Sequence, residues 1–403
     1  PGDELEVRIT SDKRSFCSAE IVDVITPSAD RITPVCPLAG RCGGCHWQHV
    51  DYAQQCAEKR DIFADALWRG ARVERAQIGE LVPSSLQYGY RSRAQFKLHG
   101  RGEHLQIGFY RQGTHFVEDA PEGCPVAAPV INSSLMALRA VLRDFAEPDR
   151  IPQINIDSAE QGAVAIVNYI GQDADAAATF FAERAGELAP LTGLYLQTGR
   201  KSTLRKVYGD DALYYTLPDH NGSPCRLMFR PGGFSQVNLA QNRALLELVR
   251  GMADLQGHER LLDLYCGNGN FSLPLASQVS SVTGIEAYPA SIEAAVSNAA
   301  ANRIENAEFV CADTASGLRH LLDQGRHFDL VVLDPPRQGA ADAVSLIAAL
   351  APARVIYVSC DPGTLARDCA DFRKNDYFVV SSVPVDMFPQ TYHLESVTLL
   401  QKV

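Results

Sequence analysis

The chain has 403 residues, of which 46% are hydrophobic and 21% charged, and its formal net charge is −11. This length predicts two or three domains, and the composition is typical of a globular protein. No apolar run reaches the roughly 18 residues of a transmembrane helix and no signal peptide is visible, so we expect a cytoplasmic protein without membrane contact. The acidic total disfavours a nucleic-acid partner unless local basic patches outweigh it.

The first strand-like segments, at 4–10 and 19–25, alternate apolar and polar residues as half-buried strands do. Two strands do not make a stable unit on their own. We therefore expect residues 1–34 to be part of a small β domain.

The next segment, CPLAGRCGGCHWQH, spaces Cys36, Cys42 and Cys45 as C-x5-C-x2-C. Three thiols at this spacing predict a metal site, and either zinc or an iron–sulfur cluster would require a fourth ligand. The spacing does not choose between these metals. The fourth ligand is also open from the residues alone, with three candidates: Cys17, Cys56 and Cys124. The chain has eleven cysteines, an odd number, which favours reduced thiols or metal ligands over a disulfide framework.

The middle of the chain, residues 35–230, mixes strand and helix patterns, with helical spacing at 51–68, near 130–146 and near 173–187. We expect the helical part of 51–80 to pack on the C-terminal domain. Two basic clusters lie in this region, and they are candidates for phosphate contact or simply solvated strand faces. The first comprises Arg91, Arg93, Lys97 and Arg101, and the second Arg200, Lys201, Arg205 and Lys206.

Residues 231–403 alternate apolar strands with Ala-rich helical segments, which predicts a doubly wound α/β sheet. The expected strands are 260–265, 281–286, 307–313, 328–334, 354–359, 378–386 and 396–400. In such a sheet the ligand lies at the carboxyl ends of the strands.

Acidic residues end three successive strands of this sheet. LLDLYCGNGNFSLPLA is a strand, a glycine turn and a helix. Asp263 ends this strand, Glu286 the next strand and Asp313 the third. Carboxylates there can accept hydrogen bonds from ribose hydroxyls and an adenine amino group. Because the dinucleotide motif G-x-G-x-x-G is absent, the pattern favours S-adenosylmethionine over a nicotinamide cofactor. The alternative is that the acids only cap strand–helix turns.

A thiol follows the fifth strand, in VIYVSCDPGTLARD. Cys360 directly precedes a helix that Pro362 starts well, so the helix dipole is expected to stabilise its thiolate unless Asp361 opposes this. Beside a methyl donor, such a thiolate can add to carbon 6 of uracil and activate carbon 5. A base must then remove the carbon 5 proton, and Glu395 or His393 can do so. The alternative is an inert buried cysteine.

These motifs together resemble the RNA uracil-5 methyltransferase family, closest to its iron–sulfur-containing 23S rRNA branch. The resemblance rests on CPLAGRCGGCHWQH, GGFSQVN, LDLYCGNGNFSLPLA, LDPPRQG, VSCDPGTLARD and FPQTYHLESV, in this order, and covers nearly the whole chain. It implies a C-terminal Rossmann-like methyltransferase domain at 231–403 and a central iron–sulfur and RNA-binding domain at 35–230. It also implies that 1–34 is the second half of an OB-type barrel.

The resemblance assigns roles to individual residues. It implies that Cys360 is the nucleophile and Glu395 the base, with Phe234 near the target uracil. S-adenosylmethionine would contact Gln236, Tyr265, Asn270, Glu286, Asp313 and Asp334. A [4Fe-4S] cluster would be bound by Cys36, Cys42, Cys45 and Cys124. We expect a monomer that methylates a uridine of rRNA, with the T-loop uridine of tRNA as the alternative, and a cluster that supports folding or RNA docking.

Three other functions fit the sequence less well. A cytosine-5 methyltransferase of RNA would carry a second cysteine where this chain has DPPR, and an amino-group methyltransferase an aromatic residue in place of Arg337. A non-catalytic, metal-stabilised RNA-binding protein would not need both Cys360 and Glu395.

Overall fold

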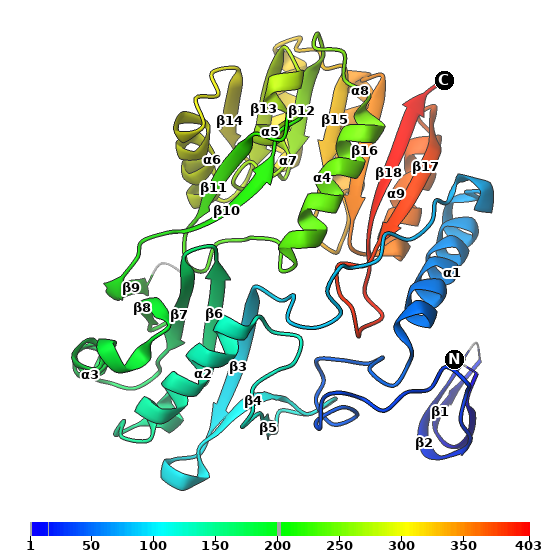
Figure 1. Cartoon of the computed structure of the whole chain (residues 1–403). Helices are drawn as coiled ribbons and strands as arrows, with labels where there is room; N and C mark the ends of the chain where they lie inside the picture. The colour runs from blue at the N-terminus through cyan, green and yellow to red at the C-terminus, as the bar shows by residue number, and fades with distance from the viewer. Residues whose placement is uncertain (1, 15, 200–202) are drawn as a thin grey trace.

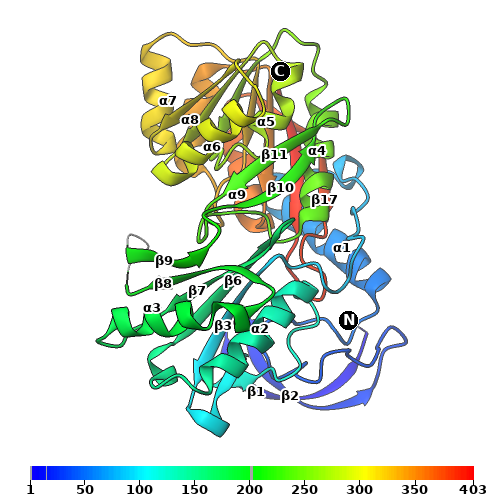
Figure 2. The same ribbon diagram turned by 60° about the vertical axis from the view of Figure 1, so that its left-hand side comes forward.

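The computed structural model describes residues 2–14, 16–199 and 203–403. It contains two seven-stranded sheets, one above the other in Figures 1 and 2, and a separate N-terminal hairpin. No helix of this part of the chain is long and apolar enough to cross a membrane.

The C-terminal sheet has the strand order β14-β13-β12-β15-β16-β18-β17. Neighbours from β14 to β16 are parallel, whereas β18 runs antiparallel to both of its neighbours. The predicted alternation of strands and helices is confirmed. The strands are β12 (Arg260–Leu264), β13 (Ser281–Glu286), β14 (Ala307–Cys311), β15 (Leu330–Leu333), β16 (Arg354–Ser359), β17 (Tyr377–Val385) and β18 (Glu395–Lys402).

Helices cover both faces of this sheet, because alternate side chains of each strand point to opposite faces. One face packs against α1 (Tyr52–Ala71), α7 (Thr314–Asp323), α8 (Ala341–Leu350) and α9 (Pro362–Arg373). The other packs against α4 (Leu239–Ala253), α5 (Ser272–Leu275) and α6 (Pro289–Ala301).

Helix α1 comes from the N-terminal part of the chain but packs beside α9 (Figure 1). Its buried residues Phe63 and Leu67 share one core with Leu365 and Phe372 of α9. The helices approach so closely that a Cβ at Gly70 would lie 2.6 Å from that of Ala366. The side chain of Asp51 caps the helix by accepting a hydrogen bond from the Ala53 amide at 3.0 Å.

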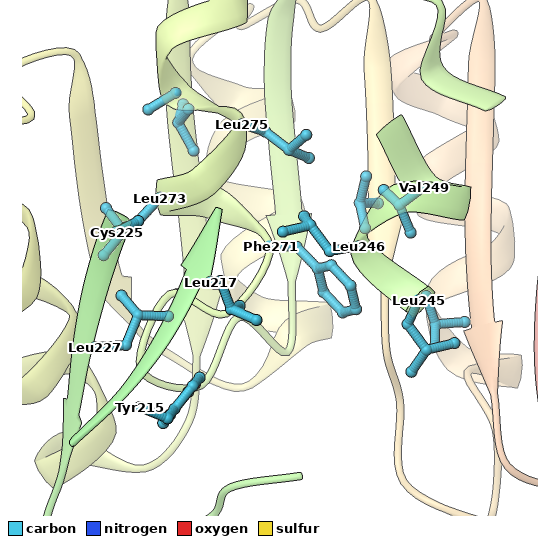
Figure 3. Packing of buried hydrophobic residues seen from close by; sticks show 14 of the residues in the cluster. Tyr215, Leu217, Cys225, Leu227, Leu245, Leu246, Val249, Phe271, Leu273 and Leu275 are labelled. Atoms are coloured by element: carbon cyan, nitrogen blue, oxygen red, sulfur yellow. The ribbon is translucent and has the colours of Figure 1, made fainter. Parts of the chain in front are cut away.

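The hairpin β10 (Leu213–Pro218) and β11 (Pro224–Phe229) also packs on the C-terminal sheet. Figure 3 shows its side chains Tyr215, Leu217 and Leu227 beside α4 and the segment that carries Phe271. These residues precede 230, where we divided the chain by its pattern, yet they lie in the core of the C-terminal sheet.

The central sheet has the order β5-β4-β3-β6-β7-β8-β9, with only β7 and β8 parallel among neighbours in the described chain. Helices α2 (Pro129–Leu142) and α3 (Ala174–Glu183) cover one face, as Figure 2 shows. Both helices were predicted. The strands are β3 (Arg93–His99), β4 (Gln106–Tyr110), β5 (Val117–Asp119), β6 (Gln153–Ala159), β7 (Gly162–Asn168), β8 (Leu191–Gln197) and β9 (Leu204–Gly209).

The N-terminal hairpin pairs β1 (Glu4–Lys13) with β2 (Phe16–Thr26), as predicted. It lies at the end of the molecule away from the C-terminal sheet (Figures 1 and 2). An ion pair of 2.6 Å between Arg31 and Asp3 connects it to the following segment. Its large apolar side chains are exposed: Val7, Ile9, Phe16, Ile21, Val22 and Ile25.

Candidate active site and thiol cavity

The turn after β12 has the geometry of a ligand-binding loop. Tyr265 has a φ of 61°, which is uncommon for a residue other than glycine and marks positions under functional constraint. Gly267 and Gly269 follow with φ of 56° and 91°. A Cβ at Gly269 would lie 2.7 Å from the Leu273 side chain, so the turn requires glycine there.

Two of the three acidic strand ends hold backbone groups near this turn. Glu286 accepts hydrogen bonds from the Gly267 amide at 3.3 Å and from the Tyr288 amide at 2.8 Å. Asp313 lies two residues after β14 and caps α7, because it accepts a 2.9 Å hydrogen bond from the Ser316 amide. Its carboxylate is exposed. Capping is therefore one role of Asp313, and it leaves the carboxylate accessible to a ligand.

Asn270 is fixed by an amide network. Its Oδ1 accepts hydrogen bonds from the Tyr215 hydroxyl at 3.0 Å and from Asn242 Nδ2 at 2.8 Å. Its Nδ2 donates to Asn242 Oδ1 at 3.0 Å. The side-chain amide is therefore held in one orientation.

Asp334 follows β15 and meets a residue from the segment before α4. Gln236 Nε2 donates to Asp334 Oδ2 at 3.4 Å, and Gln236 is buried. Phe234, two residues earlier, is 62% exposed, which is unusual for so large an apolar side chain.

Cys360 and Glu395 lie side by side because of the antiparallel strand β18. Ser359, the last residue of β16, pairs with Ser396, so their chain neighbours Cys360 and Glu395 are brought together at the same edge as Asp334. Burial raises the pKa of Glu395 well above its usual value, the Asp334 carboxylate raises it further, and the Arg337 guanidinium opposes the shift. Glu395 Oε2 is buried and has no hydrogen-bond partner among the residues described.

The pKa of Cys360 is raised to about 12, chiefly by burial and then by the carboxylates of Glu395 and Asp334, with Arg337 opposing. Burial and the neighbouring carboxylates therefore outweigh any stabilisation of the thiolate by the helix dipole in the chain alone. Asp361 caps α9 by accepting from the Thr364 amide at 2.8 Å, and its charge also raises the thiol pKa, so it opposes the dipole.

His393, the rival base, lies in the loop before β18, outside the strand that begins at Glu395. The two side chains therefore do not share a strand face. Its ring centroid is 4.3 Å from that of Tyr392 and 6.3 Å from that of His46. Burial lowers its pKa to about 4. Glu395 is among the groups that shift the pKa of Cys360, whereas the His393 ring is not named among them.

Arg337 is a site residue whose role the sequence did not reveal. In the sequence Arg337 served only to disfavour an amino-group methyltransferase, but its guanidinium acts on both Cys360 and Glu395. Its backbone carbonyl accepts a 3.1 Å hydrogen bond from the Thr364 hydroxyl of α9. A lone cation in a motif that is otherwise acidic and apolar was the available signal.

The four thiols of the second site, Cys36, Cys42, Cys45 and Cys124, line one cavity of about 310 Å³. The other two candidate ligands lie elsewhere, Cys17 in the exposed hairpin and Cys56 on α1. In the part of the chain that the structure describes, no three His, Cys, Asp or Glu side chains are grouped so as to hold a single metal ion.

The chemistry of this cavity fits a group that binds thiolates. Burial raises the pKa of Cys42 to about 11 and of Cys45 to about 12, and the neighbouring thiols add to both shifts. Arg91 also lines the cavity, and its buried Nε has no hydrogen-bond partner among the described residues. An anionic group with acceptor atoms would satisfy this cation.

Most cations of the two basic clusters already have partners. Four of them form ion pairs, which are Arg93–Asp157, Arg101–Asp149, Arg205–Asp175 and Lys206–Asp211. Lys97 donates to Gln153. Arg200 and Lys201 lie outside the described residues. The clusters therefore offer less positive charge for phosphate contact than their sequence suggests.

A family model described as "tRNA (Uracil-5-)-methyltransferase" matches residues 51–403, and this range contains Cys360, Glu395 and Cys124. This chain belongs to that family. The resemblance seen in the sequence is thereby confirmed, and the chain is an RNA uracil-5 methyltransferase that uses S-adenosylmethionine.

Two relatives are similar over the whole chain. The 23S rRNA (uracil(1939)-C(5))-methyltransferase RlmD of Alkalilimnicola ehrlichii is 34% identical over 100% of this chain and 90% of its own length. The enzyme of the same name from Vibrio parahaemolyticus is 32% identical over 100% and 89%. Among solved structures, the tRNA (uracil-54, C5)-methyltransferase of Pyrococcus abyssi, in complex with S-adenosyl-L-homocysteine, has the same fold. It has a TM-score of 0.75, 23% identity, and coverage of 99% of this chain and 93% of that one.

Proposed function

We propose that the enzyme methylates carbon 5 of one uridine in 23S rRNA, with Cys360 as nucleophile and Glu395 as base. The observation that supports this is the pairing of Ser359 with Ser396, which brings a thiol and a buried carboxylate together at the cofactor edge of the sheet. Both groups are required by the chemistry of an unreactive pyrimidine carbon.

The reaction balances as follows. The Cys360 thiolate adds to carbon 6 of uracil, and the electron pair of the 5,6 double bond moves to carbon 5. Carbon 5 takes the methyl group from its donor, whose methyl–sulfur bond breaks with the electron pair left on sulfur. Glu395 then removes the carbon 5 proton. The released electron pair restores the double bond and expels the thiolate. Phe234, exposed beside Gln236, is suited to contact a uracil that has left its stack. We expect it to come from a loop.

S-adenosylmethionine would supply the methyl group and a sulfonium charge. The residues that fit it are the strand-end acids and the turn, namely Gln236, Tyr265, Asn270, Glu286, Asp313 and Asp334. Glu286 is oriented by the Gly267 and Tyr288 amides, and Asn270 by its amide network. Because a nearby positive charge lowers the pKa of acidic groups, a cation at this edge would favour the ionised forms of Cys360 and Glu395.

The thiol cavity is proposed to hold a [4Fe-4S] cluster on Cys36, Cys42, Cys45 and Cys124. The four thiols line one cavity, which supports a shared group bound by thiolates. The resemblance to the iron–sulfur-containing branch of the family favours the cluster over zinc, which also accepts four thiolates.

The choice of rRNA rests on relatives named for 23S rRNA that match the full length of the chain at above 30% identity. Uridine 54 of tRNA is the second candidate, since the family description and the Pyrococcus structure both refer to tRNA. We propose a monomer in which residues 1–34 belong to an OB-type domain and the central sheet contributes to RNA binding. Mapping of methyluridines in rRNA and tRNA from a strain without the gene would decide between the substrates.

The chemical proposal is tested with RNA that contains 5-fluorouridine. Fluorine replaces the proton that Glu395 must remove, so the enzyme and the methylated RNA should remain covalently joined. The adduct should be absent with Cys360→Ala and present with Cys311→Ser, which changes an exposed thiol. An adduct with Cys360→Ala would contradict the assignment, and no adduct with the unaltered protein would favour a non-catalytic RNA-binding protein.

A further inference from the structure

The loop between β17 and β18, residues 386–394, carries Glu395 at its end and is held at nearly every residue by distant parts of the chain. Asp386 accepts from Lys59 Nζ at 2.6 Å and from the Tyr52 hydroxyl at 2.9 Å. The Phe388 carbonyl accepts from Lys59 at 3.0 Å, and the Pro389 carbonyl from the Tyr90 hydroxyl at 3.0 Å.

Gln390 lies at the centre of this anchoring. Its backbone amide donates to Gln55 Oε1 at 3.0 Å, and its side-chain Oε1 accepts from Gln55 Nε2 at 3.0 Å. Its φ is 71°, a left-handed conformation that is unfavourable for a glutamine and persists only where the surroundings impose it. Gln55 and Gln390 are buried, so water does not replace these bonds.

The segment after Cys45 holds the same residue from the other side. The His46 and Trp47 amides both donate to the Gln390 carbonyl, at 2.9 and 3.0 Å. Gln55 Nε2 also donates to the Trp47 carbonyl at 3.0 Å, so one side chain joins α1, the thiol segment and the loop. The His46 ring lies 4.6 Å from that of Tyr392, centroid to centroid.

We propose that Gln55 is a positioning residue for the final step of the reaction, acting through Gln390 to hold Glu395 against carbon 5. The inference rests on the proposed function and extends it. Glu395 has no hydrogen bond to its Oε2 from the described residues, so its position depends on the strand register and on the loop that precedes it. Displacement of a catalytic group by about 1 Å can cost roughly 10²-fold in rate.

The hydrogen bonds between Gln55 and Gln390, here called the clamp, should act on proton removal and not on the earlier steps. Addition of Cys360 and methyl transfer use residues on β16, β15 and the β12 turn, none of which contacts Gln55 in the hydrogen bonds described. Loss of the clamp should therefore leave the enzyme able to form the covalent intermediate but slow to resolve it. A residue that only stabilises the fold would slow both steps equally.

The experiment compares Gln55→Ala with Gln54→Ala. Gln54 is the adjacent residue of α1, and its side chain bonds only to Glu58 of the same helix among the described contacts. Two rates are measured for each protein with saturating S-adenosylmethionine. The first is adduct formation on 5-fluorouridine RNA, and the second is release of methylated product from ordinary RNA, with the covalent complex quantified on denaturing gels.

For Gln55→Ala we expect adduct formation at the unaltered rate and product release about 10- to 100-fold slower, with covalent complex accumulating on ordinary RNA. Gln54→Ala should match the unaltered protein in both. If Gln55→Ala does not fold, Gln390→Gly serves instead, because glycine accepts the positive φ while removing the side-chain bond to Gln55.

Two results would overturn the inference. One is release at the unaltered rate from the folded variants, and the other is an equal slowing of adduct formation and release. These differ from failure of the proposed function, in which the unaltered protein itself forms no adduct.

Discussion

The chain contains two regions where buried thiols cluster with other groups, and their surroundings differ. Cys360 lies beside the carboxylates of Glu395 and Asp334, whereas the cavity thiols lie beside one another and Arg91. In both regions burial raises the thiol pKa. Burial thus disfavours ionisation of Cys360, Cys42 and Cys45 in the chain alone, and a positive charge from a bound group would favour it. At Cys360 that charge would be consumed in each reaction, while in the cavity it would be permanent.

The secondary structure that positions the thiols also differs between the two regions. Cys360 follows a central strand of a regular sheet, and the ladder between β16 and β18 fixes its distance to Glu395. The cavity thiols are on loops, with Cys124 almost eighty residues from Cys45 in the chain. A site on strand ends is set by backbone pairing, but a site on loops depends on the group that it binds.

The largest effect is expected for Cys360→Ser. Loss of the nucleophile should reduce methylation by at least about 10⁴-fold, because no other described group at this edge can add to carbon 6. Iron content and melting temperature should stay unchanged, since the substitution does not touch the cavity. Transfer of a labelled methyl group to RNA measures the activity. Residual activity above 1% of normal would mean that another thiol acts.

The next effect is expected for Glu395→Gln, which keeps the shape of the side chain but removes the base. Turnover should fall about 10²- to 10⁴-fold, while adduct formation with 5-fluorouridine RNA persists. His393→Ala should reduce turnover far less. Equal losses in the two variants would assign the base to the imidazole.

The activity of the unaltered enzyme should also depend on pH in a defined direction. The base is active as carboxylate, and its pKa is raised, so Glu395 takes up its proton at a higher pH than an ordinary glutamate. The value of kcat/KM should therefore fall with decreasing pH well before the usual glutamate range is reached. An acidic limb at pH 4–5 would contradict the burial of this group.

A smaller effect on chemistry is expected for Cys42→Ser in the cavity. The protein should lose its iron and sulfide, about four of each per chain in the unaltered form, and melt about 5 °C lower or more. Cys17→Ser, an exposed thiol of the hairpin, should change neither quantity. Zinc in place of iron, measured by elemental analysis after anaerobic purification, would reject the cluster.

The smallest effect is expected for Asp313→Ala. Loss of one exposed carboxylate should weaken S-adenosylmethionine binding by about 2- to 10-fold, the range for a single hydrogen bond. Asp173→Ala removes an equivalent cap, on α3, and should lower stability slightly without any change in cofactor affinity. Calorimetric titration with S-adenosylmethionine measures the cofactor affinity of both variants. If the two variants bind the cofactor equally, Asp313 is only a cap.

The C-terminal sheet was predictable because its strands are buried on both faces and read as apolar runs between helices. The direction of β18 was not predictable, because the composition of a strand does not show whether it runs parallel or antiparallel to its neighbours. That direction brings Glu395 beside Cys360. The residues alone therefore left Glu395 and His393 open as the base, and the family resemblance chose Glu395.

The central region was predicted less completely. The patterns QFKLH, LQIGFY, QINID and GAVAIVNYI predicted β3, β4, β6 and β7. Strands β5, β8 and β9 and the hairpin β10–β11 were not named, although LTGLYLQ of β8 has a strand composition. The cavity thiols could be named as candidate ligands, but the sequence pattern could not place them at one site. Loops have no periodic pattern from which their position in space can be predicted. The anchoring of residue 390 by Gln55 was invisible too, since a buried glutamine in a helix is read from sequence as a solvated one.

The packing of α1 on α9 has a consequence for biosynthesis. The ribosome makes α1 early and α9 near the end, and at about 5–20 residues per second the interval is roughly 15–60 s. During this time the surface formed by Phe63 and Leu67 has no partner. Although all seven strands of the C-terminal sheet lie within residues 260–402, the core on one face of this sheet is completed by α1. The nascent chain should therefore depend on chaperones that shield apolar helices, and a fragment of residues 231–403 should aggregate.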